Sequence, residues 1–537
     1  MTPEEWIAHD PDPVTAAELA ACDAAELAAR FARPLTFGTA GLRGPVRGGP
    51  DAMNTAVVCR ATWALAQVLA ARGEAAATVV VGGDARHGSA RFATATAEVL
   101  AAEGFSVLLL PGPVPTPVVA FAVRHTGAAA GVQITASHNP ATDNGYKVYV
   151  RGGLQILAPI DAEIEAAMAA APPADRIART PVSTTGTELI ETYLASAAAL
   201  RRTDGPVTVA LTALHGVGGK AVVTALGQAG IDEVHVVDTQ FAPDPDFPTV
   251  AFPNPEEPGA ADAVLELAAA VDAEVAIALD PDADRCAVGV RTDAGWRMLS
   301  GNETGWLLGD YLLSTLAAED RATAVVATTV VSSRMLAAIA AHHGARHVET
   351  LTGFKWLARA DADLPGTRLL YAYEEAIGHC VDPDAVRDKD GIATAVLVCD
   401  LVAALRAAGT SIPRRLDELA RRHGVHVGAA VTRRAADIAE ATAVMRRLRT
   451  APPTDIAGRA VAIADLADHR GRWRTDALIF TGGDDDVALR VVVRPSGTEP
   501  KLKCYIEVRV PVTDAVDTAR HRGERVRDAV VAQVGRW

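Results

Sequence analysis

Lysine is scarce in this sequence of 537 residues. Only six of its 51 basic residues are Lys, and Arg carries the rest of the positive charge. Lys differs from Arg in being a compact charge whose pKa responds readily to its surroundings. A lysine kept against this bias is expected to do something that arginine cannot, and the candidates are Lys147, Lys220, Lys355, Lys389, Lys501 and Lys503.

Cysteine is also scarce, and no Cys-x-x-Cys pair occurs. The six cysteines are scattered along the chain, at Cys22, Cys59, Cys286, Cys380, Cys399 and Cys504. Such scatter argues against a zinc site or a disulfide framework and is typical of a reducing compartment.

Long apolar runs and a secretion signal are missing as well. No apolar run reaches the roughly 18 residues that a membrane span requires. The first ten residues, MTPEEWIAHD, lack the basic and apolar regions of a signal peptide. We therefore expect a cytoplasmic protein with no membrane partner.

An excess of positive charge is absent, since the formal net charge is -15. Such a surface repels a phosphate backbone, so we expect no nucleic-acid partner. A small anionic substrate would need a local basic pocket set against this charge.

Ala-rich helical stretches alternate with short runs rich in Val and Ile. This alternation predicts α/β layers with buried strands, and the chain length predicts three or four domains. The strand-like runs span residues 78–81, 106–110, 207–211, 234–237, 275–279 and 324–331.

The segment after Gly424 has a different pattern, with several strands, a Pro-Pro linker at 452–453 and a closing helix. That pattern indicates an α+β domain. We predict three similar α/β domains and a C-terminal α+β domain, with boundaries at 1–203, 204–315, 316–423 and 424–537.

A serine loop follows one of the apolar runs. The sequence Thr-Ala-Ser-His-Asn-Pro at 135–140 comes directly after residues 131–134. Side chains at the carboxyl end of a buried strand lie where α/β proteins bind ligands. Ser137 is thus a candidate nucleophile that needs a base or a metal for activation, although Asn139 and Pro140 could simply form a turn.

A second loop carries alternating carboxylates. Asp280, Asp282 and Asp284 follow the run at 275–279 and precede Arg285. Carboxylates that converge in a tight loop provide the oxygen ligands that Mg²⁺ prefers. Arg285 and Arg291 stand where an EF-hand needs Gly and Glu, so that site is excluded. A nucleophilic aspartate of the haloacid-dehalogenase type remains an alternative.

Two further motifs point to a phosphorylated sugar. Arg494, Ser496, Gly497 and Thr498 crowd a turn after a strand, and such a turn can bind a phosphate through backbone and side-chain donors. Glu374 and Glu375 form a carboxylate pair that can accept hydrogen bonds from sugar hydroxyls, although a structural role is equally compatible with the pattern.

The order of these motifs resembles the α-D-phosphohexomutase superfamily. Supporting strings are Gly-Thr-Ala-Gly-Leu-Arg-Gly at 38–44, Thr-Ala-Leu-His-Gly-Val-Gly-Gly at 212–219, Thr-Gly-Phe-Lys at 352–355 and Arg-Asp-Lys-Asp-Gly at 387–391. The details resemble the phosphoglucomutase-2/phosphopentomutase branch, from about residue 36 to 510.

The resemblance implies four domains around a central cleft and a phosphosugar mutase that acts through a phosphoserine. Ser137 would carry the phosphoryl group and bind Mg²⁺ together with Asp280, Asp282 and Asp284. Arg285 would lie beside the seryl phosphate, Glu374 and Glu375 would meet the sugar, and the turn at 494–498 would hold the other phosphate. The cleft would also be lined by Arg43, His138, Lys147, Lys355 and Lys389.

The implied cycle transfers phosphate between two hydroxyls of one sugar through a sugar bisphosphate, which would also serve as activator. Lys147 is the predicted general base, and His138 is the second choice. Many hexose-specific relatives carry Glu-x-Ser, whereas Ala376 follows the glutamates here. Glucose, mannose and pentose phosphates therefore remain open. A magnesium phosphatase that uses Asp280, or a sugar-phosphate sensor, is the alternative.

Overall fold

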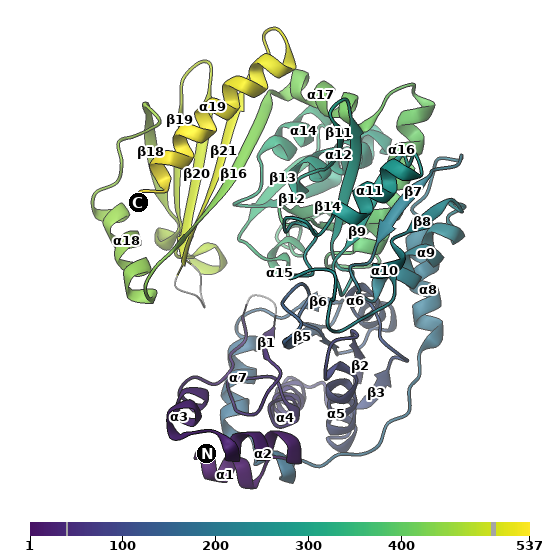
Figure 1. Ribbon diagram of the computed structural model, residues 1–537, viewed down its shortest axis with the longest axis vertical. Coiled ribbons are helices and arrows are strands. Elements are labelled where there is room, and N and C mark those ends of the chain that lie inside the picture. The colour runs from purple at the N-terminus through teal and green to yellow at the C-terminus, as the bar shows by residue number, and fades with distance from the viewer. Residues whose placement is uncertain (39–40, 496–500) are drawn as a thin grey trace. The chain divides into compact units, whose positions relative to one another are not determined.

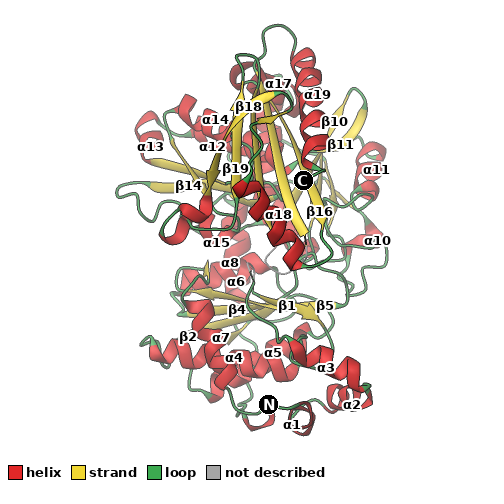
Figure 2. Cartoon of the chain, turned by 90° about the vertical axis from the view of Figure 1, so that its left-hand side faces the viewer, coloured by secondary structure: helices red, strands yellow, loops and turns green. Residues whose placement is uncertain are grey.

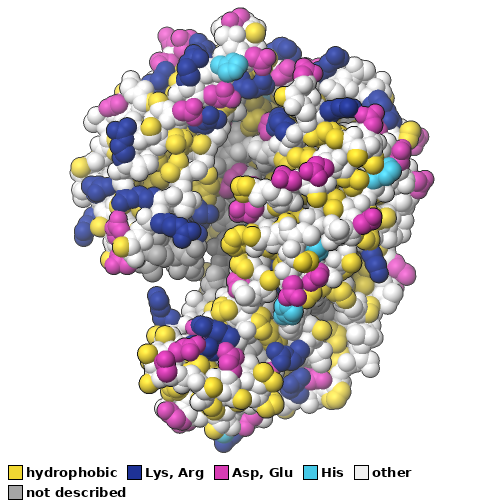
Figure 3. Space-filling model, in the orientation of Figure 1, with side chains coloured by type: hydrophobic (Ala, Val, Ile, Leu, Met, Phe, Trp, Pro, Cys, Tyr) yellow, Lys and Arg dark blue, Asp and Glu magenta, His cyan; other side chains and the backbone are white. Residues whose placement is uncertain are grey.

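The computed structural model describes residues 1–38, 41–495 and 501–537, and the chain divides into two compact units. The first unit contains Met1–Thr304, Gly353–Arg359 and Leu370–Ala408. The second contains Gly305–Thr352, Ala360–Leu369 and Gly409–Trp537. Basic and acidic side chains lie among one another over the face shown in Figure 3, without a field of one sign.

The first unit begins with a helix-covered sheet. Its strands run in the order β1-β5-β4-β2-β3, with β6 beside β5, and Figure 2 shows α4, α5 and α7 on one side with α6 and α8 on the other. The elements are α1 (Pro3–Ala8), α2 (Pro13–Ala21), α3 (Ala24–Ala32), β1 (Leu42–Pro45), α4 (Thr55–Ala71), β2 (Thr78–Gly83), α5 (Ser89–Ala102), β3 (Ser106–Leu109), α6 (Thr116–Thr126), β4 (Ala130–Ile134), β5 (Asp143–Val150), β6 (Leu154–Gln155), α7 (Ile160–Ala170) and α8 (Thr187–Ala198).

A second sheet follows in the same unit, in the order β11-β10-β9-β7-β8. Every residue of its central strand β9 is buried, which explains the unbroken apolar run. The elements are β7 (Val209–Thr212), α9 (Gly218–Gln228), β8 (Val234–Val236), α10 (Asp238–Phe241), α11 (Asp262–Ala270), β9 (Val275–Leu279), β10 (Cys286–Thr292) and β11 (Gly295–Met298).

The next stretch of chain contributes to both units. In the second unit β12 pairs in parallel with β13, and in the first unit β14 pairs antiparallel with β15. The elements are α12 (Gly301–Thr315), α13 (Ala318–Thr323), β12 (Ala324–Thr329), α14 (Met335–His343), β13 (Arg346–Thr350), α15 (Phe354–Leu357), β14 (Arg368–Glu374), β15 (Gly378–Cys380), α16 (Gly391–Ala407) and α17 (Ile412–His423).

The C-terminal part of the second unit is an antiparallel sheet in the order β16-β21-β20-β19-β18-β17. Apolar residues at alternate positions of β16, β20 and β21 face α18 and α19 and form a core with them, and both helices are visible in Figure 1. The elements are β16 (Val425–Arg434), α18 (Ile438–Thr450), β17 (Asp455–Ile456), β18 (Arg459–Asp465), β19 (Leu478–Gly483), β20 (Ala488–Pro495), β21 (Lys501–Val510) and α19 (Val516–Val534).

These sheets confirm the predicted fold class, and each apolar run contains a strand at the expected place. The predicted domain boundaries remain predictions. No single described helix is long and apolar enough to cross a membrane; only the bent pair α16 and α17 passes by length and composition, and α16 is largely buried.

Glycines at the start of α9 let that helix approach the Asp280 loop. A Cβ at Gly218 would lie 2.7 Å from the side chains of Ala283 and Leu279, and one at Gly216 would fall on the backbone of Pro281. The amide of Val217 also donates to the carbonyl of Pro281 over 2.8 Å. The glycine-rich string at 212–219 therefore packs closely against the carboxylate loop.

Two glycines of α9 give a matched test. Gly218→Ala should destabilise the protein and lower activity, because its methyl group has no room beside the carboxylate loop. Gly227→Ala meets nothing within 4 Å, so it should stabilise the protein by about 0.5–1 kcal/mol through better helix propensity. Urea unfolding and turnover measure both. Equal effects of the two substitutions would contradict this account of the loop.

Candidate active site

The serine loop lies between β4 and β5 and holds Ser137 in an unusual conformation. The φ angle of Ser137 is 55°, in the left-handed region that non-glycine residues rarely adopt. Such a conformation costs about 1–3 kcal/mol and persists only where its surroundings impose it. The hydroxyl of Thr135 accepts the Ser137 amide over 2.8 Å, and the Ser137 side chain is buried.

The carboxylate loop lies directly against this serine. The Ser137 hydroxyl donates to Oδ2 of Asp280 over 3.1 Å, while Oδ1 of Asp280 accepts the amide of Arg285 over 3.0 Å. Asp280, Asp282 and Asp284 are all buried, and one oxygen of each lies within 4.8 Å of the others. The structure thus brings together the two motifs that the sequence singled out 143 residues apart.

The same three carboxylates fit a metal ion. Oδ1 of Asp282 and Oδ1 of Asp284 are buried and have no hydrogen-bond partner among the described residues. Buried carboxylate oxygens are normally satisfied, so two orphans beside a third carboxylate indicate a cation site. An all-oxygen donor set matches a hard cation such as Mg²⁺.

The Oδ2 atoms of Asp282 and Asp284 accept hydrogen bonds from the first sheet and from α6. Lys147 on β5 donates to Oδ2 of Asp282 over 2.7 Å and to Oδ2 of Asp284 over 2.8 Å. Thr116 at the start of α6 donates its hydroxyl to Oδ2 of Asp282 over 2.6 Å and its amide to the Asp282 carbonyl over 2.9 Å. These contacts fix the carboxylates so that their Oδ1 atoms remain available.

Burial and charge shift the pKa values of this cluster in opposite directions. Burial and the charges of Asp282 and Asp284 raise the pKa of Asp280 well above its usual range. Burial is the largest influence on Asp282 and raises its pKa, but the charge and hydrogen bond of Lys147, together with the hydrogen bond of Thr116, hold this pKa below the usual range. Burial opposes the charge of Lys147, yet both carboxylates raise its pKa.

Arg285 links the serine loop to the Glu374 loop. Its guanidinium donates to Nδ1 of His138 and lies 3.7 Å from the Glu374 carboxylate. Burial and the positive charges of Arg285 and Arg43 hold the pKa of His138 well below its usual range. Because a guanidinium can only donate, Nδ1 of His138 is the acceptor in this contact.

Lys389 approaches the carboxylates beside the start of α16. Its ammonium lies 3.3 Å from Oδ2 of Asp284 and 3.6 Å from Oδ1 of Asp388. Asp388 is held by the Tyr149 hydroxyl over 2.8 Å and by the Gln155 amide over 2.7 Å. Burial opposes the charge of Lys389, but these carboxylates raise its pKa.

Other predicted residues lie farther from the carboxylates. Arg43 on β1 donates to the Asn139 side chain over 3.3 Å, at the edge of the serine loop. Lys355 on α15 is half-buried, and burial lowers its pKa against the opposing charge of Asp161. Glu375 follows Glu374 in the turn after β14.

The predicted phosphate turn is described only at its start. Arg494, at the end of β20, donates to the hydroxyl of Thr352, and both residues belong to the second unit. Ser496, Gly497 and Thr498 lie outside the described residues.

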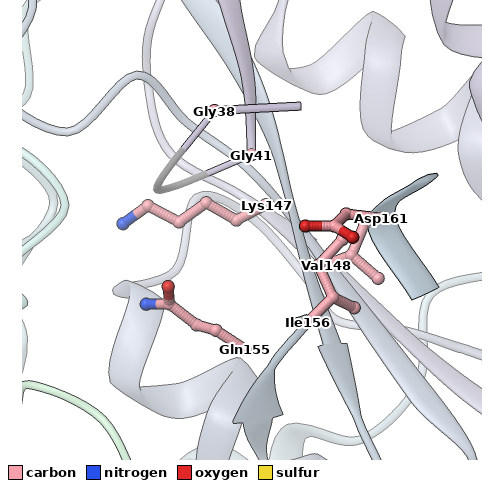
Figure 4. A pocket seen from close by; sticks show the side chains of 7 residues that line it. All are labelled: Gly38, Gly41, Lys147, Val148, Gln155, Ile156 and Asp161. Carbon is pink, nitrogen blue, oxygen red and sulfur yellow. The ribbon is translucent and has the colours of Figure 1, made fainter. Parts of the chain in front are cut away.

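A cavity of about 10 Å³ lies behind Lys147. In Figure 4, Lys147 and Gln155 extend to one side of the strands, whereas Val148, Ile156 and Asp161 lie on the other. This volume holds about one water molecule and is far too small for a sugar phosphate.

Sequence reasoning missed two residues that shape the site. Thr116 contacts Asp282 as described above, and Arg86 contacts the backbone of the serine loop. Arg86 follows β2 and Thr116 follows β3, both at the carboxyl edge of the first sheet, a position that could have drawn attention to them. Neither belongs to a string whose chemistry is evident from composition.

A buried serine, a carboxylate cluster fit for a metal, and surrounding Lys and Arg define an enzyme of phosphoryl transfer. The sequence models of the phosphoglucomutase/phosphomannomutase family match the chain in order. Its α/β/α domains I, II and III match residues 34–174, 189–295 and 300–423, and its C-terminal domain matches 454–518. The chain belongs to this family and is a phosphosugar mutase.

Relatives with different substrates in their names are similar over most of the chain. A "Probable phosphomannomutase" of Haemophilus influenzae is 40% identical and covers 85% of this chain and 93% of its own length. A "Probable phosphoribomutase" of Schizosaccharomyces pombe is 34% identical, with 94% and 93% covered. The phosphopentomutase of Mus musculus is 32% identical, with 94% and 90% covered.

Solved structures share the fold at lower identity. A phosphoglucomutase/phosphomannomutase family protein from Burkholderia thailandensis has a TM-score of 0.68 at 20% identity, and covers 92% of this chain and 97% of its own. Parafusin, a phosphoglucomutase from Paramecium, has a TM-score of 0.69 at 19% identity, with 92% and 95% covered.

Thr116 gives a test of the metal site that does not depend on turnover. Thr116→Val keeps the shape of the side chain but removes the hydrogen bond that orients Asp282. Loss of such an outer contact typically weakens metal binding about 10–100-fold, and Mg²⁺ titration by calorimetry should show it. Thr116→Ser keeps the hydroxyl and should bind like the wild type. Unchanged affinity in Thr116→Val would contradict the orienting role.

Proposed function

We propose that the protein interconverts hexose 1-phosphates and 6-phosphates, such as those of glucose or mannose, by way of a phosphorylated Ser137. The observation that carries this proposal is the hydrogen bond of the Ser137 hydroxyl to Asp280 inside a buried carboxylate cluster. A serine held at a cation site is suited to donate and accept a phosphoryl group, because phosphoryl transfer depends mainly on positioning and charge neutralisation.

Asp280, Asp282 and Asp284 would hold one Mg²⁺ together with an oxygen of the seryl phosphate. The orphaned oxygens of Asp282 and Asp284 support this assignment. When bound, the ion supplies charge neutralisation to the phosphoryl oxygens.

The cationic side chains around the carboxylates would balance the remaining charge. Arg285 and Lys389 both contact the cluster and belong to the same unit as Ser137. Lys147 donates to two carboxylates as an ammonium, and Nδ1 of His138 is occupied by Arg285. These contacts favour charge-neutralising and positioning roles over the roles as general base predicted for both residues.

Arg494 would bind the phosphate that is not being transferred, with Ser496, Gly497 and Thr498 as its neighbours in sequence. A mutase must hold its substrate by either phosphate, so a second phosphate site away from Ser137 is required. The hydrogen bond of Arg494 to Thr352 would orient the guanidinium for this contact. A sugar bisphosphate would recharge Ser137 whenever the intermediate escapes.

A pentose phosphate is the second candidate substrate. Glu374 and Glu375 can accept bonds from sugar hydroxyls, but Ala376 offers no hydroxyl of its own. A site that makes fewer polar demands tolerates sugars with fewer hydroxyls. The names of the relatives, which include both phosphomannomutase and phosphopentomutase, are consistent with such breadth.

Ser137→Ala tests the phosphoserine. Removing the hydroxyl removes the group that accepts the phosphate, so mutase turnover should fall to background. Intact mass and peptide mapping of the wild type should locate one phosphate on Ser137. Turnover of Ser137→Ala near the wild-type rate would contradict the mechanism.

A panel of glucose, mannose, ribose and deoxyribose 1-phosphates tests the sugar. We expect conversion of both hexose and pentose, with a sugar bisphosphate present. Ala376→Ser adds a donor and should shift the kcat/KM ratio toward hexose. The proposed breadth is wrong if a single sugar is converted or if Ala376→Ser leaves the ratio unchanged.

A further inference from the structure

Arg86 donates hydrogen bonds to the backbone of the serine loop. Its Nη1 donates to the carbonyl oxygens of Pro140 and Asp143 over 2.8 and 3.2 Å, and its Nη2 donates to those of Ser137 and Asn139 over 2.5 and 2.7 Å. One guanidinium thus holds three carbonyl groups of the serine loop, including that of Ser137 itself, and the carbonyl of Asp143 at the start of β5.

These contacts bear on the conformation of Ser137. Within the loop, the amide of Ser137 donates to the Thr135 hydroxyl, and the amide of Asn139 donates to the carbonyl of Ala136. Arg86 adds a restraint on the carbonyl side of Ser137, and restraint from both sides is what a left-handed residue needs. The position of the Ser137 hydroxyl beside Asp280 depends on that conformation.

Arg86 is itself fixed in place. It lies between β2 and α5 with 4% of its surface exposed, and its Nε lies 3.4 Å from the Asp84 carboxylate. The ring of Phe247 covers the guanidinium at 5.0 Å. A buried arginine with a paired charge and a rigid planar fork can hold carbonyls in a defined arrangement, whereas the three donors of lysine leave from one nitrogen.

Among the described residues, Arg86 makes no hydrogen bond to Asp280, Asp282 or Asp284, and it acts on Asp280 and Asp282 only through its charge. Its contacts are all to the loop and to its own anchors. A role in binding substrate would predict a donor directed away from the loop, but both terminal nitrogens are engaged by loop carbonyls.

We propose that Arg86 is the positioning residue of the nucleophile, holding the Ser137 loop so that the serine oxygen stays aligned for phosphoryl transfer. This role rests on the proposed function of Ser137 as phosphoryl carrier. Misplacement of a reacting atom by about 1 Å can cost about 100-fold in rate, so the loss should appear in the transfer step and not in substrate binding.

The test compares Arg86→Ala and Arg86→Lys with Arg91→Gln in the full chain. Arg91 lies on α5 and forms an ion pair with Asp12 outside the site, so its substitution controls for loss of an arginine from this region. We expect Arg86→Ala to lower kcat and the single-turnover rate of transfer from phospho-Ser137 by about 100-fold, with KM little changed. Arg86→Lys should retain part of the rate, and Arg91→Gln all of it.

Free guanidinium at low concentration can replace the missing group in Arg86→Ala. It should raise the transfer rate of Arg86→Ala at least several-fold and leave Arg86→Lys unaffected. If Arg86→Ala does not fold, Arg86→Lys decides alone: a wild-type transfer rate overturns the proposal, and a reduced rate at unchanged KM supports it.

The outcomes separate this role from the proposed function. A wild type that carries no phosphate on Ser137 contradicts the phosphoserine mechanism and the role of Arg86 with it. If the wild type is phosphorylated and active, and the Arg86 variants have the same single-turnover rate as the wild type, only the positioning role is overturned. A raised KM at unchanged kcat also overturns it, because that pattern indicates a substrate contact.

Discussion

The rest of the first unit depends on the neutralisation of three buried carboxylates. One carboxylate oxygen of each of Asp280, Asp282 and Asp284 lies within 4.8 Å of the others, and all three side chains are buried. Like charges at such distances in a buried site repel strongly unless cations and hydrogen-bond donors surround them. The Lys147 ammonium, the Lys389 ammonium and the Arg285 amide supply that surrounding.

The need to neutralise these carboxylates explains why the first two sheets of the unit meet at the carboxylate loop. Lys147, Thr116 and Ser137 all come from the first sheet or its loops, and all three donate to carboxylates that follow β9 of the second sheet. The glycines of α9 and the glycine that begins α16 allow backbone to approach the loop closely. A Cβ at Gly391 would fall among the carbonyl oxygens of Ala283 and Arg285.

The serine loop is organised differently. Whereas several donors surround the carboxylates, a single cation, Arg86, donates hydrogen bonds to several carbonyl groups of this loop. The loop directs its carbonyl groups toward Arg86 and the Ser137 hydroxyl toward Asp280. Charge on both sides of a short loop fixes it more firmly than turn propensity alone could. A left-handed serine is tolerable here because these contacts act on the backbone on both sides of its Cα.

The sequence alone was enough to predict the strands that lie in its apolar runs, the loops that carry the chemistry, and the family. Buried parallel strands produce unbroken apolar runs, as in β9, and the residues that follow such runs lie at a ligand-binding edge wherever the chain folds this way. Only the tertiary structure decided which side chains donate hydrogen bonds to the buried carboxylates. Thr116 and Arg86 have no distinctive local pattern, and Lys147 turned out to donate to Asp282 and Asp284 from 135 and 137 residues away. Periodicity and composition predict local structure, because they depend on residues that are close in sequence. Which buried charges pair depends instead on where strands that are far apart in sequence end in the folded protein.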